Sequence, residues 1–98
     1  MTYTIEFTEE AKRDLAYFTA HARKKILHKV REQLSHEPSV QTRNRKSLRD
    51  NPVAPWELRI GHYRVFYQID QNVVTVGVVA VGQKRHNILY IRGKQVEL

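Results

Sequence analysis

The feature that most restricts the fold is a run of three short segments in which apolar and polar side chains alternate. They are Trp56–Ile60, Tyr63–Asp70 and Val73–Val81. A period of two is typical of β-strands with one buried face, and the segments are rich in β-branched and aromatic residues. Gly61-His62 and Gln71-Asn72 separate them, and both pairs are short enough for tight hairpin turns. We therefore predict a three-stranded antiparallel meander.

Alternation also assigns each side chain in this meander to a face of the sheet. In the first strand, one face carries Trp56, Leu58 and Ile60, and the other carries Glu57 and Arg59. The apolar set must face the core, so Trp56 is expected to be a core residue. In the second strand, one face carries Tyr63, Val65, Tyr67 and Ile69, and the other carries Arg64, Phe66 and Gln68. Arg59 and Arg64 are therefore expected to share the face away from the core.

A strand and a helix are predicted at the start of the chain. Tyr3, Ile5 and Phe7 alternate with polar residues, which indicates a half-buried strand. Thr8 then has the position of a helix N-cap, with two glutamates in the first turn behind it. An apolar stripe follows at helical spacing, so the first helix should cover Glu9 to Thr19.

A second helix follows directly. Its apolar stripe is Ala22, Ile26, Val30 and Leu34, and Pro38 indicates that the helix has ended by that point. The two helices should form an antiparallel hairpin.

The order of these elements predicts an α+β fold in a single domain, residues 1–98. Helices followed by a run of strands pack on one face of a mainly antiparallel sheet of three to four strands. The other sheet face would then be open and available as a shallow binding surface. Ile88–Ile91 is a candidate last strand, and Arg92-Gly93-Lys94 should be a turn that leads to a polar tail.

The charge of the chain favours a polyanionic partner. Lysine and arginine total 17 against 10 aspartates and glutamates, which gives a formal net charge of +7. Such an excess attracts nucleic acid but does not specify chemistry. The segment Ser39–Pro55 has no regular period, and we interpret it as a basic loop. It is either a solvated loop or, beside an open sheet face, a loop that holds RNA backbone by charge. Its cations are Arg43, Arg45, Lys46 and Arg49.

Several other classes of protein are disfavoured. The longest apolar run, Val76–Val81, is too short to cross a bilayer, and no secretory leader opens the chain. With no cysteine, these features lead us to expect a cytoplasmic protein. There is no phosphate-binding loop motif and no Gly-x-Ser-x-Gly motif. His21 and His28 are seven residues apart on one helical face, but they have no partner at metal-ligand spacing, so a solvated pair is expected.

The C-terminal half of the chain resembles the RelE/ParE toxin superfamily. The string WELRIGHYRVFYQID is followed by VGVVAVGQKRHNILY. The shared elements are Leu58-Arg59, the strand Tyr63-Arg64-Val65-Phe66-Tyr67, the valine-rich segment 73–81, Gly82 with Lys84-Arg85-His86, and the late Tyr90. The N-terminal strand and helical hairpin agree as well, so the likeness covers most of the chain. It implies a RelE-like microbial RNase fold.

The resemblance also implies a function. RelE-type toxins cut messenger RNA in the ribosomal A site without a metal or cofactor, and the RNA's own 2′-hydroxyl is the nucleophile. By this likeness, Arg64 would stabilise the phosphate, with Lys84 or Arg85 as a second cation. Arg59, on the same face as Arg64, is a candidate RNA-binding residue, and a solvated strand residue is the alternative. Tyr90 would stack on a base or orient the nucleophile. The expected partners are the ribosome, messenger RNA and a cognate antitoxin whose acidic amphipathic segment covers the basic face.

The chain departs from this pattern at the proposed base. Some RelE-type toxins have two lysines where this sequence has Pro55 and Glu57. The candidates for acid–base catalysis are then Glu57, His86 or a ribosomal group, and Glu57 with His86 is a possible pair. The lost lysines leave two other hypotheses open: a ParE-like inhibitor of DNA gyrase without nuclease activity, and an inactive, antitoxin-binding member.

Overall fold

Two threonines define where the helices begin in the computed structural model, which describes residues 2–97. Thr8 Oγ1 accepts a hydrogen bond from the amide of Ala11 at 3.1 Å, and Thr19 Oγ1 accepts one from Ala22 at 3.2 Å. Each side chain satisfies one of the free amides at a helix start, which confirms Thr8 as an N-cap. The first helix ends at Tyr17 rather than at the predicted Thr19, because Thr19 caps the second helix.

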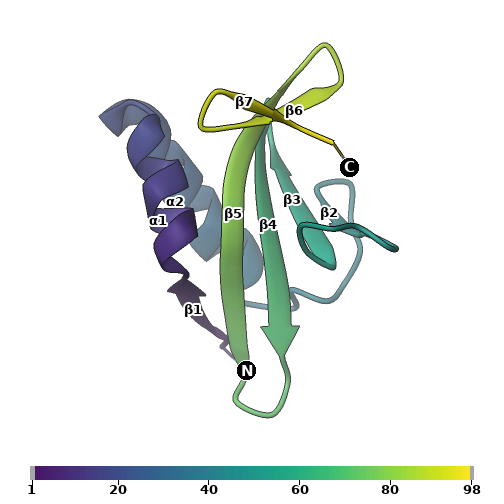
Figure 1. Ribbon diagram of the computed structural model, residues 1–98. Coiled ribbons are helices and arrows are strands. Elements are labelled where there is room, and N and C mark those ends of the chain that lie inside the picture. Colours follow the sequence, from purple (N-terminus) through teal and green to yellow (C-terminus); the bar gives the residue numbers. More distant parts are fainter. Residues whose placement is uncertain (1, 98) are drawn as a thin grey trace.

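The strands form one sheet beside the two helices (Figure 1). The elements are β1 (Thr4–Phe7), α1 (Glu9–Tyr17), α2 (Ala20–Leu34), β2 (Arg45–Ser47), β3 (Trp56–Ile60), β4 (Tyr63–Asp70), β5 (Thr75–Arg85), β6 (Ile88–Ile91) and β7 (Lys94–Val96). The sheet order is β2-β3-β4-β5-β6-β7, and β1 pairs with β5 in parallel. The α+β class, the antiparallel meander and the strand at Ile88–Ile91 are confirmed.

Some boundaries differ from the prediction. The loop between β4 and β5 spans residues 71–74, and β5 continues to Arg85 rather than ending at Val81. β2 and β7 were not predicted, since β2 lies inside the expected basic loop and β7 inside the expected tail. Each has three residues and is formed by pairing with a longer neighbour, which a local sequence pattern does not record.

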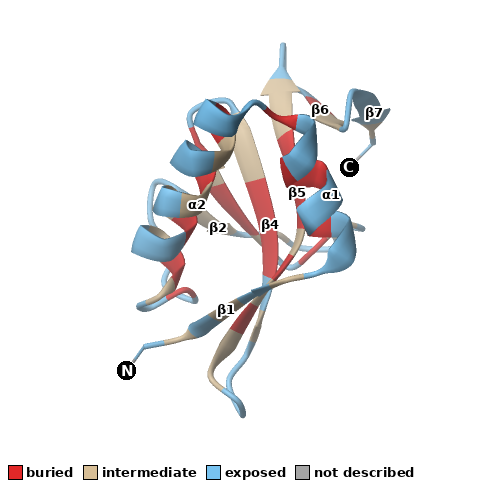
Figure 2. Ribbon diagram, turned by 90° about the vertical axis from the view of Figure 1, so that its left-hand side faces the viewer, coloured by how far each residue is buried: buried red, intermediate tan, exposed pale blue. Residues whose placement is uncertain are grey.

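The main core lies between the helices and one face of the sheet, as Figure 2 shows by the buried inner sides of α1 and α2. Val65 and Tyr67 of β4 belong to this core, together with Leu58 of β3. Trp56 packs against it, with its ring stacked on Tyr67 at a centroid distance of 5.9 Å. The face assignments of β3 and β4 are therefore confirmed. Neither helix in residues 2–97 has the length and apolar character of a membrane span.

The opposite sheet face is not open, which corrects our expectation. It carries a second apolar cluster around Phe66, which is fully buried. The chain between β2 and β3 folds back over this face, and Leu48 N donates to Pro55 O at 2.8 Å. The other buried members are Ala54, Ala80 and Leu89, with Leu48, Val53, Val79, Ile91 and Val96 packed against them. Burying a phenylalanine side chain stabilises the folded state by about 1.5–3 kcal/mol, which favours the covering of Phe66.

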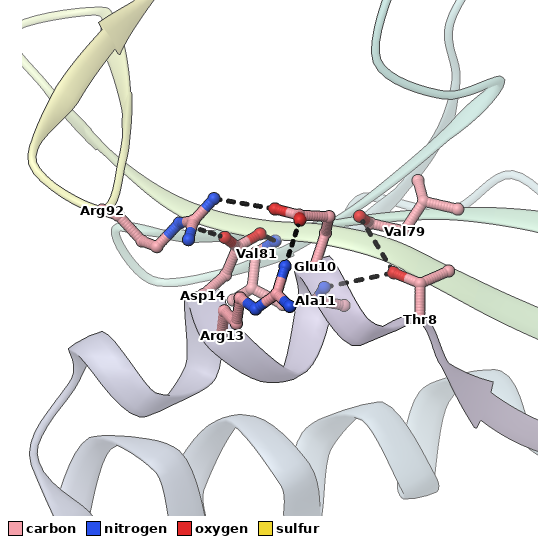
Figure 3. A network of polar contacts seen from close by, with 8 residues as sticks. All are labelled: Thr8, Glu10, Ala11, Arg13, Asp14, Val79, Val81 and Arg92. Carbon is pink, nitrogen blue, oxygen red and sulfur yellow. Dashed lines mark hydrogen bonds and ion pairs between the residues drawn. The ribbon is translucent and has the colours of Figure 1, made fainter.

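One edge of β5 is completed by side chains of the α1 region (Figure 3). β1 pairs with β5 only as far as Val78, and β6 begins to pair at Gln83, so the edge between them has no strand neighbour. Asp14 Oδ2 accepts a hydrogen bond from Val81 N at 3.0 Å in this gap. Asp14 Oδ1 is 3.0 Å from Arg92 Nε, an ion pair that ties the β6–β7 turn to α1. Burial raises the pKa of Asp14, against the opposing effects of the Val81 amide and of Arg92.

Candidate functional site

The candidate site lies where the β3–β4 turn meets the end of β5. Gly61 has a φ of +58°, which suits the first central position of a two-residue hairpin turn. The next residue, His62, accepts a hydrogen bond through its carbonyl from Lys84 N at 2.8 Å. This bond holds the turn against β5 just before the β5–β6 hairpin.

A surface groove is formed at this junction. Its lining residues are His62, Gln83, Lys84, Arg85 and His86. It brings two imidazoles together with an ammonium and a guanidinium group, which are groups that transfer protons and stabilise phosphate charge. The sequence pattern indicates Lys84, Arg85 and His86 as site residues but not His62. By sequence, His62 is only a turn residue, and its place beside Lys84 depends on how the turn packs against β5.

Arg64 lies next to this junction, on the face opposite the helices. It is paired in register with Gly82, where an added Cβ would lie 2.5 Å from Tyr90 O, so that position has no room for a side chain. Arg64 Nη1 donates to the carbonyls of Gly61 and Tyr63 at 2.8 and 2.9 Å. Its buried Nε has no hydrogen-bond partner, and within residues 2–97 it forms no ion pair. Desolvation by burial lowers the pKa of Arg64, partly opposed by Glu57.

Glu57 balances two arginines on the same face. Arg59 and Arg64 are direct cross-strand neighbours, an arrangement in which like charges repel. Glu57 is 2% exposed, and its Oε1 accepts a hydrogen bond from Arg59 Nε at 3.0 Å. Its carboxylate is therefore occupied and shielded from solvent.

Glu57 and His86 are not brought together as the possible acid–base pair. Glu57 pairs with Phe66, which pairs with Ala80, whereas His86 follows the end of β5. Six residues of extended chain separate Ala80 from His86, or about 20 Å. His86 and Asn87 form the hairpin turn with φ values of +50° and +66°. Their side chains are exposed at its tip.

The remaining predicted residues divide between the two sides of the β5–β6 hairpin. Lys84 pairs with Leu89, a member of the second cluster, so Lys84 lies on the same face as Arg64. Tyr90 pairs with Gln83 and points to the other side. Arg85 lies over the Tyr90 ring, 5.8 Å from its centroid. The structure thus places Lys84 with Arg64, and Arg85 with Tyr90.

The cations of the basic loop differ in their contacts and in their exposure to solvent. Arg45 donates to Val40 O and Gln33 O at 3.0 and 2.7 Å, so its guanidinium holds the loop to the end of α2. Arg43 and Arg49 are exposed, and Lys46 is half-buried opposite Glu57. His21 and His28 lie outside this region on α2, and residues 2–97 contain no group of three or more metal-ligating side chains.

Comparison with known proteins identifies relatives of the chain. Residues 5–88 match the family described as the ParE toxin of the type II toxin-antitoxin system parDE. The toxin–antitoxin complex RelBE2 of Mycobacterium tuberculosis matches with 31% identity and a TM-score of 0.75, over 86% of this chain and 93% of that one. A doubly substituted E. coli RelE toxin in the free state matches with 28% identity and a TM-score of 0.65, over 85% and 84% of the two chains.

An archaeal RelE–RelB complex from Pyrococcus horikoshii shares the fold at 18% identity, with a TM-score of 0.68 over 88% of this chain and 99% of that one. No curated protein matches the chain significantly.

Proposed function

Because the chain belongs to the ParE toxin family of type II toxin-antitoxin systems, within the RelE/ParE superfamily, we propose that this toxin is a ribosome-dependent endoribonuclease. It would cut messenger RNA in the A site and so inhibit translation. The observation that carries the proposal is the groove in which His62 and His86 lie beside Lys84, with Arg64 adjacent on the same sheet. Similarity to RelE toxins at 31% and 28% identity supports it.

The proposed reaction is a transesterification. The RNA 2′-oxygen attacks the neighbouring phosphorus, the bond from phosphorus to the 5′-oxygen breaks, and a 2′,3′-cyclic phosphate forms. One imidazole takes the 2′-hydroxyl proton, and the other donates a proton to the departing 5′-oxygen. Arg64 and Lys84 balance the charge that grows on the non-bridging oxygens. Glu57 has no direct role in this scheme, because its carboxylate is buried against Arg59.

The contribution of Arg64 can be tested on ribosomes that carry a defined message. We expect Arg64→Ala to slow A-site cutting by more than about tenfold, a barrier increase above about 1.4 kcal/mol. Arg13→Ala is the matched control, since Arg13 is an exposed arginine of α1 paired with Glu10. Equal cutting by wild type and Arg64→Ala would remove Arg64 from the mechanism.

The two histidines require a separate measurement. His62→Asn and His86→Asn should each slow cutting by about 100-fold or more and each remove one limb of the pH–rate profile. Asparagine suits both turns, including the positive φ of residue 86. An unchanged profile in both variants would assign acid–base catalysis to other groups.

A second candidate function is supported by the matching family, which is described by its ParE toxins. It is inhibition of DNA gyrase without nuclease activity, and the residues at positions 55 and 57 agree with it. Expression of the toxin would separate the two functions, because a nuclease stops translation and a gyrase inhibitor causes DNA damage. Neither lesion would indicate the third possibility, an inactive member that only binds antitoxin.

A cognate antitoxin is the proposed partner in all of these cases. The M. tuberculosis and P. horikoshii relatives and an intact E. coli RelBE complex were all solved as toxin–antitoxin complexes. An acidic amphipathic segment would complement a chain with a net charge of +7 and would cover the groove around Lys84. For the proposed nuclease, deleting that segment from the antitoxin should restore cutting.

A further inference from the structure

The outer side of α2 carries a cluster of positive charge that the groove does not use. The apolar side of this helix packs into the main core through Ala22, Ile26, Val30 and Leu34. Its outer side faces away from the sheet, as Figure 2 shows by the exposed strip along α2. A shallow depression there is lined by His21, Lys24, Lys25, His28 and Lys29, which we call the α2 basic face.

The charges of this face are poorly compensated within the chain. Lys29 and His28 both contact Glu32, at 3.1 and 3.5 Å. In the part of the chain that the structure describes, Lys24 and Lys25 have no carboxylate within ion-pair distance. Two exposed lysines therefore stand side by side without an anionic partner.

The helix itself supplies no carboxylate near these cations at its start. Helix starts carry partial positive charge, which acidic side chains in the first turn offset. α1 follows this rule with Glu9 and Glu10 in its first turn. α2 has no acidic residue in its first turn, and Lys24 and Lys25 lie in the turn that follows. This end of α2 therefore keeps its positive charge for an external anion.

The chemistry of the face favours a phosphate backbone over a peptide or a lipid surface. The large apolar side chains exposed in residues 2–97 are Tyr17, Val40, Val73 and Ile88, and none belongs to α2. A peptide partner needs apolar anchors, and a membrane-bound amphipathic helix needs a free apolar face, which α2 has already buried. From His21 to Lys29 the face is about 12 Å long, enough for about three phosphates of one nucleic acid strand.

We propose that the α2 basic face binds an RNA phosphate backbone, as a second contact separate from the groove that would hold the message. This inference rests on the proposed function for its biological meaning, because a toxin that acts on ribosomes must bind structured RNA as well as its substrate. The helices cover one face of the sheet (Figure 1). Arg64 lies on the other face, as its strand register shows. One toxin would thus bind two RNA segments on opposite sides.

The test is binding of a labelled RNA duplex of about 20 base pairs, followed by fluorescence anisotropy between about 50 and 300 mM KCl. Lys24→Gln/Lys25→Gln should weaken binding roughly tenfold near 0.15 M salt and reduce the slope of log K against log salt by about 2. Lys12→Gln/Arg13→Gln is the matched control. It removes the same charge from α1, where Glu9 and Glu10 already neutralise both cations. Glutamine preserves helix propensity in both variants.

The outcomes separate this proposal from its alternatives. Equal loss in the two variants would mean that only net charge matters and would overturn the proposal. The proposal would also be overturned if Lys24→Gln/Lys25→Gln lost binding to polyglutamate or to phosphatidylserine vesicles while its duplex binding stayed unchanged. If ribosomes are not cut by the wild-type toxin but the duplex result holds, the proposed nuclease function fails and the RNA-binding face stands.

Discussion

Replacing Glu57 with glutamine keeps the shape of the side chain and removes the negative charge beside Arg59 and Arg64. The Glu57–Arg59 contact is 3.0 Å, which corresponds to a gross attraction of about 5 kcal/mol at an effective dielectric constant of about 20. Most of this is offset by the cost of burying the Glu57 side chain, which is 3% exposed. Arg59 is 38% exposed and can be hydrated again, so the loss should fall below the 3–5 kcal/mol typical of a fully buried pair. We expect Glu57→Gln to lower the free energy of unfolding by about 2 kcal/mol.

A double-mutant cycle isolates the interaction from the separate effects of each substitution. Urea unfolding of Glu57→Gln, Arg59→Gln and the double variant should give a coupling energy of about 1 kcal/mol or more. The double variant should lose less stability than the sum of the single variants, because neither partner is then left unpaired in the protein. Additive effects within about 0.5 kcal/mol would refute the pairing.

The same substitution tests whether Glu57 takes part in the reaction. A general base contributes about 100- to 10,000-fold to the rate. Glu57→Gln should retain cutting within a few-fold of wild type under conditions where it is folded, because the carboxylate only offsets the repulsion between the two arginines. A loss of more than 100-fold in a variant of unchanged stability would make Glu57 the base and refute our reasoning.

Two further predictions concern stability. Burial raises the pKa of Asp14, so the stability that depends on its protonation is present below the usual pKa of aspartate and is lost as pH rises through the raised value. The stability of wild type relative to Asp14→Asn should therefore increase as pH falls from about 7 to about 4, measured by urea unfolding; a decrease would mean that the ion pair with Arg92 dominates. Tyr67→Phe should cost about 1–2 kcal/mol in a urea titration, because the buried Tyr67 hydroxyl donates to Pro38 O at 2.8 Å and the carbonyl would lose its donor. An unchanged midpoint would show that water replaces the hydroxyl.

The parts of the fold that sequence predicts well depend on local patterns. The faces of β3 and β4 follow from a period of two, and the start of α1 follows from Thr8. The cover over Phe66 does not follow from any period, because Leu48, Val53 and Ala54 are scattered among prolines and polar residues. That cover depends on long-range packing, which local patterns do not encode.

The candidate site has the same division between local and long-range information. The position of Arg64 opposite the helices is set by alternation within β4 and was predicted. The place of His62 in the groove was not predicted, since it depends on the hydrogen bond between the β3–β4 turn and β5. The likeness to RelE toxins could not choose between Lys84 and Arg85 as the second cation, because both lie in the same basic cluster.

The length of the β5–β6 turn decides which of the two residues lies on the face of Arg64. His86 and Asn87 both have positive φ, which allows a turn of two residues and fixes the pairs Gln83 with Tyr90 and Lys84 with Leu89. A slip of one residue would move every side chain of β6 to the opposite face and bring Tyr90 beside Arg64. The buried Leu89 opposes such a slip, because its side chain would leave the second apolar cluster. The placement of Lys84 on the face of Arg64, and of Arg85 beside Tyr90, is thus a consequence of one two-residue turn and one buried leucine.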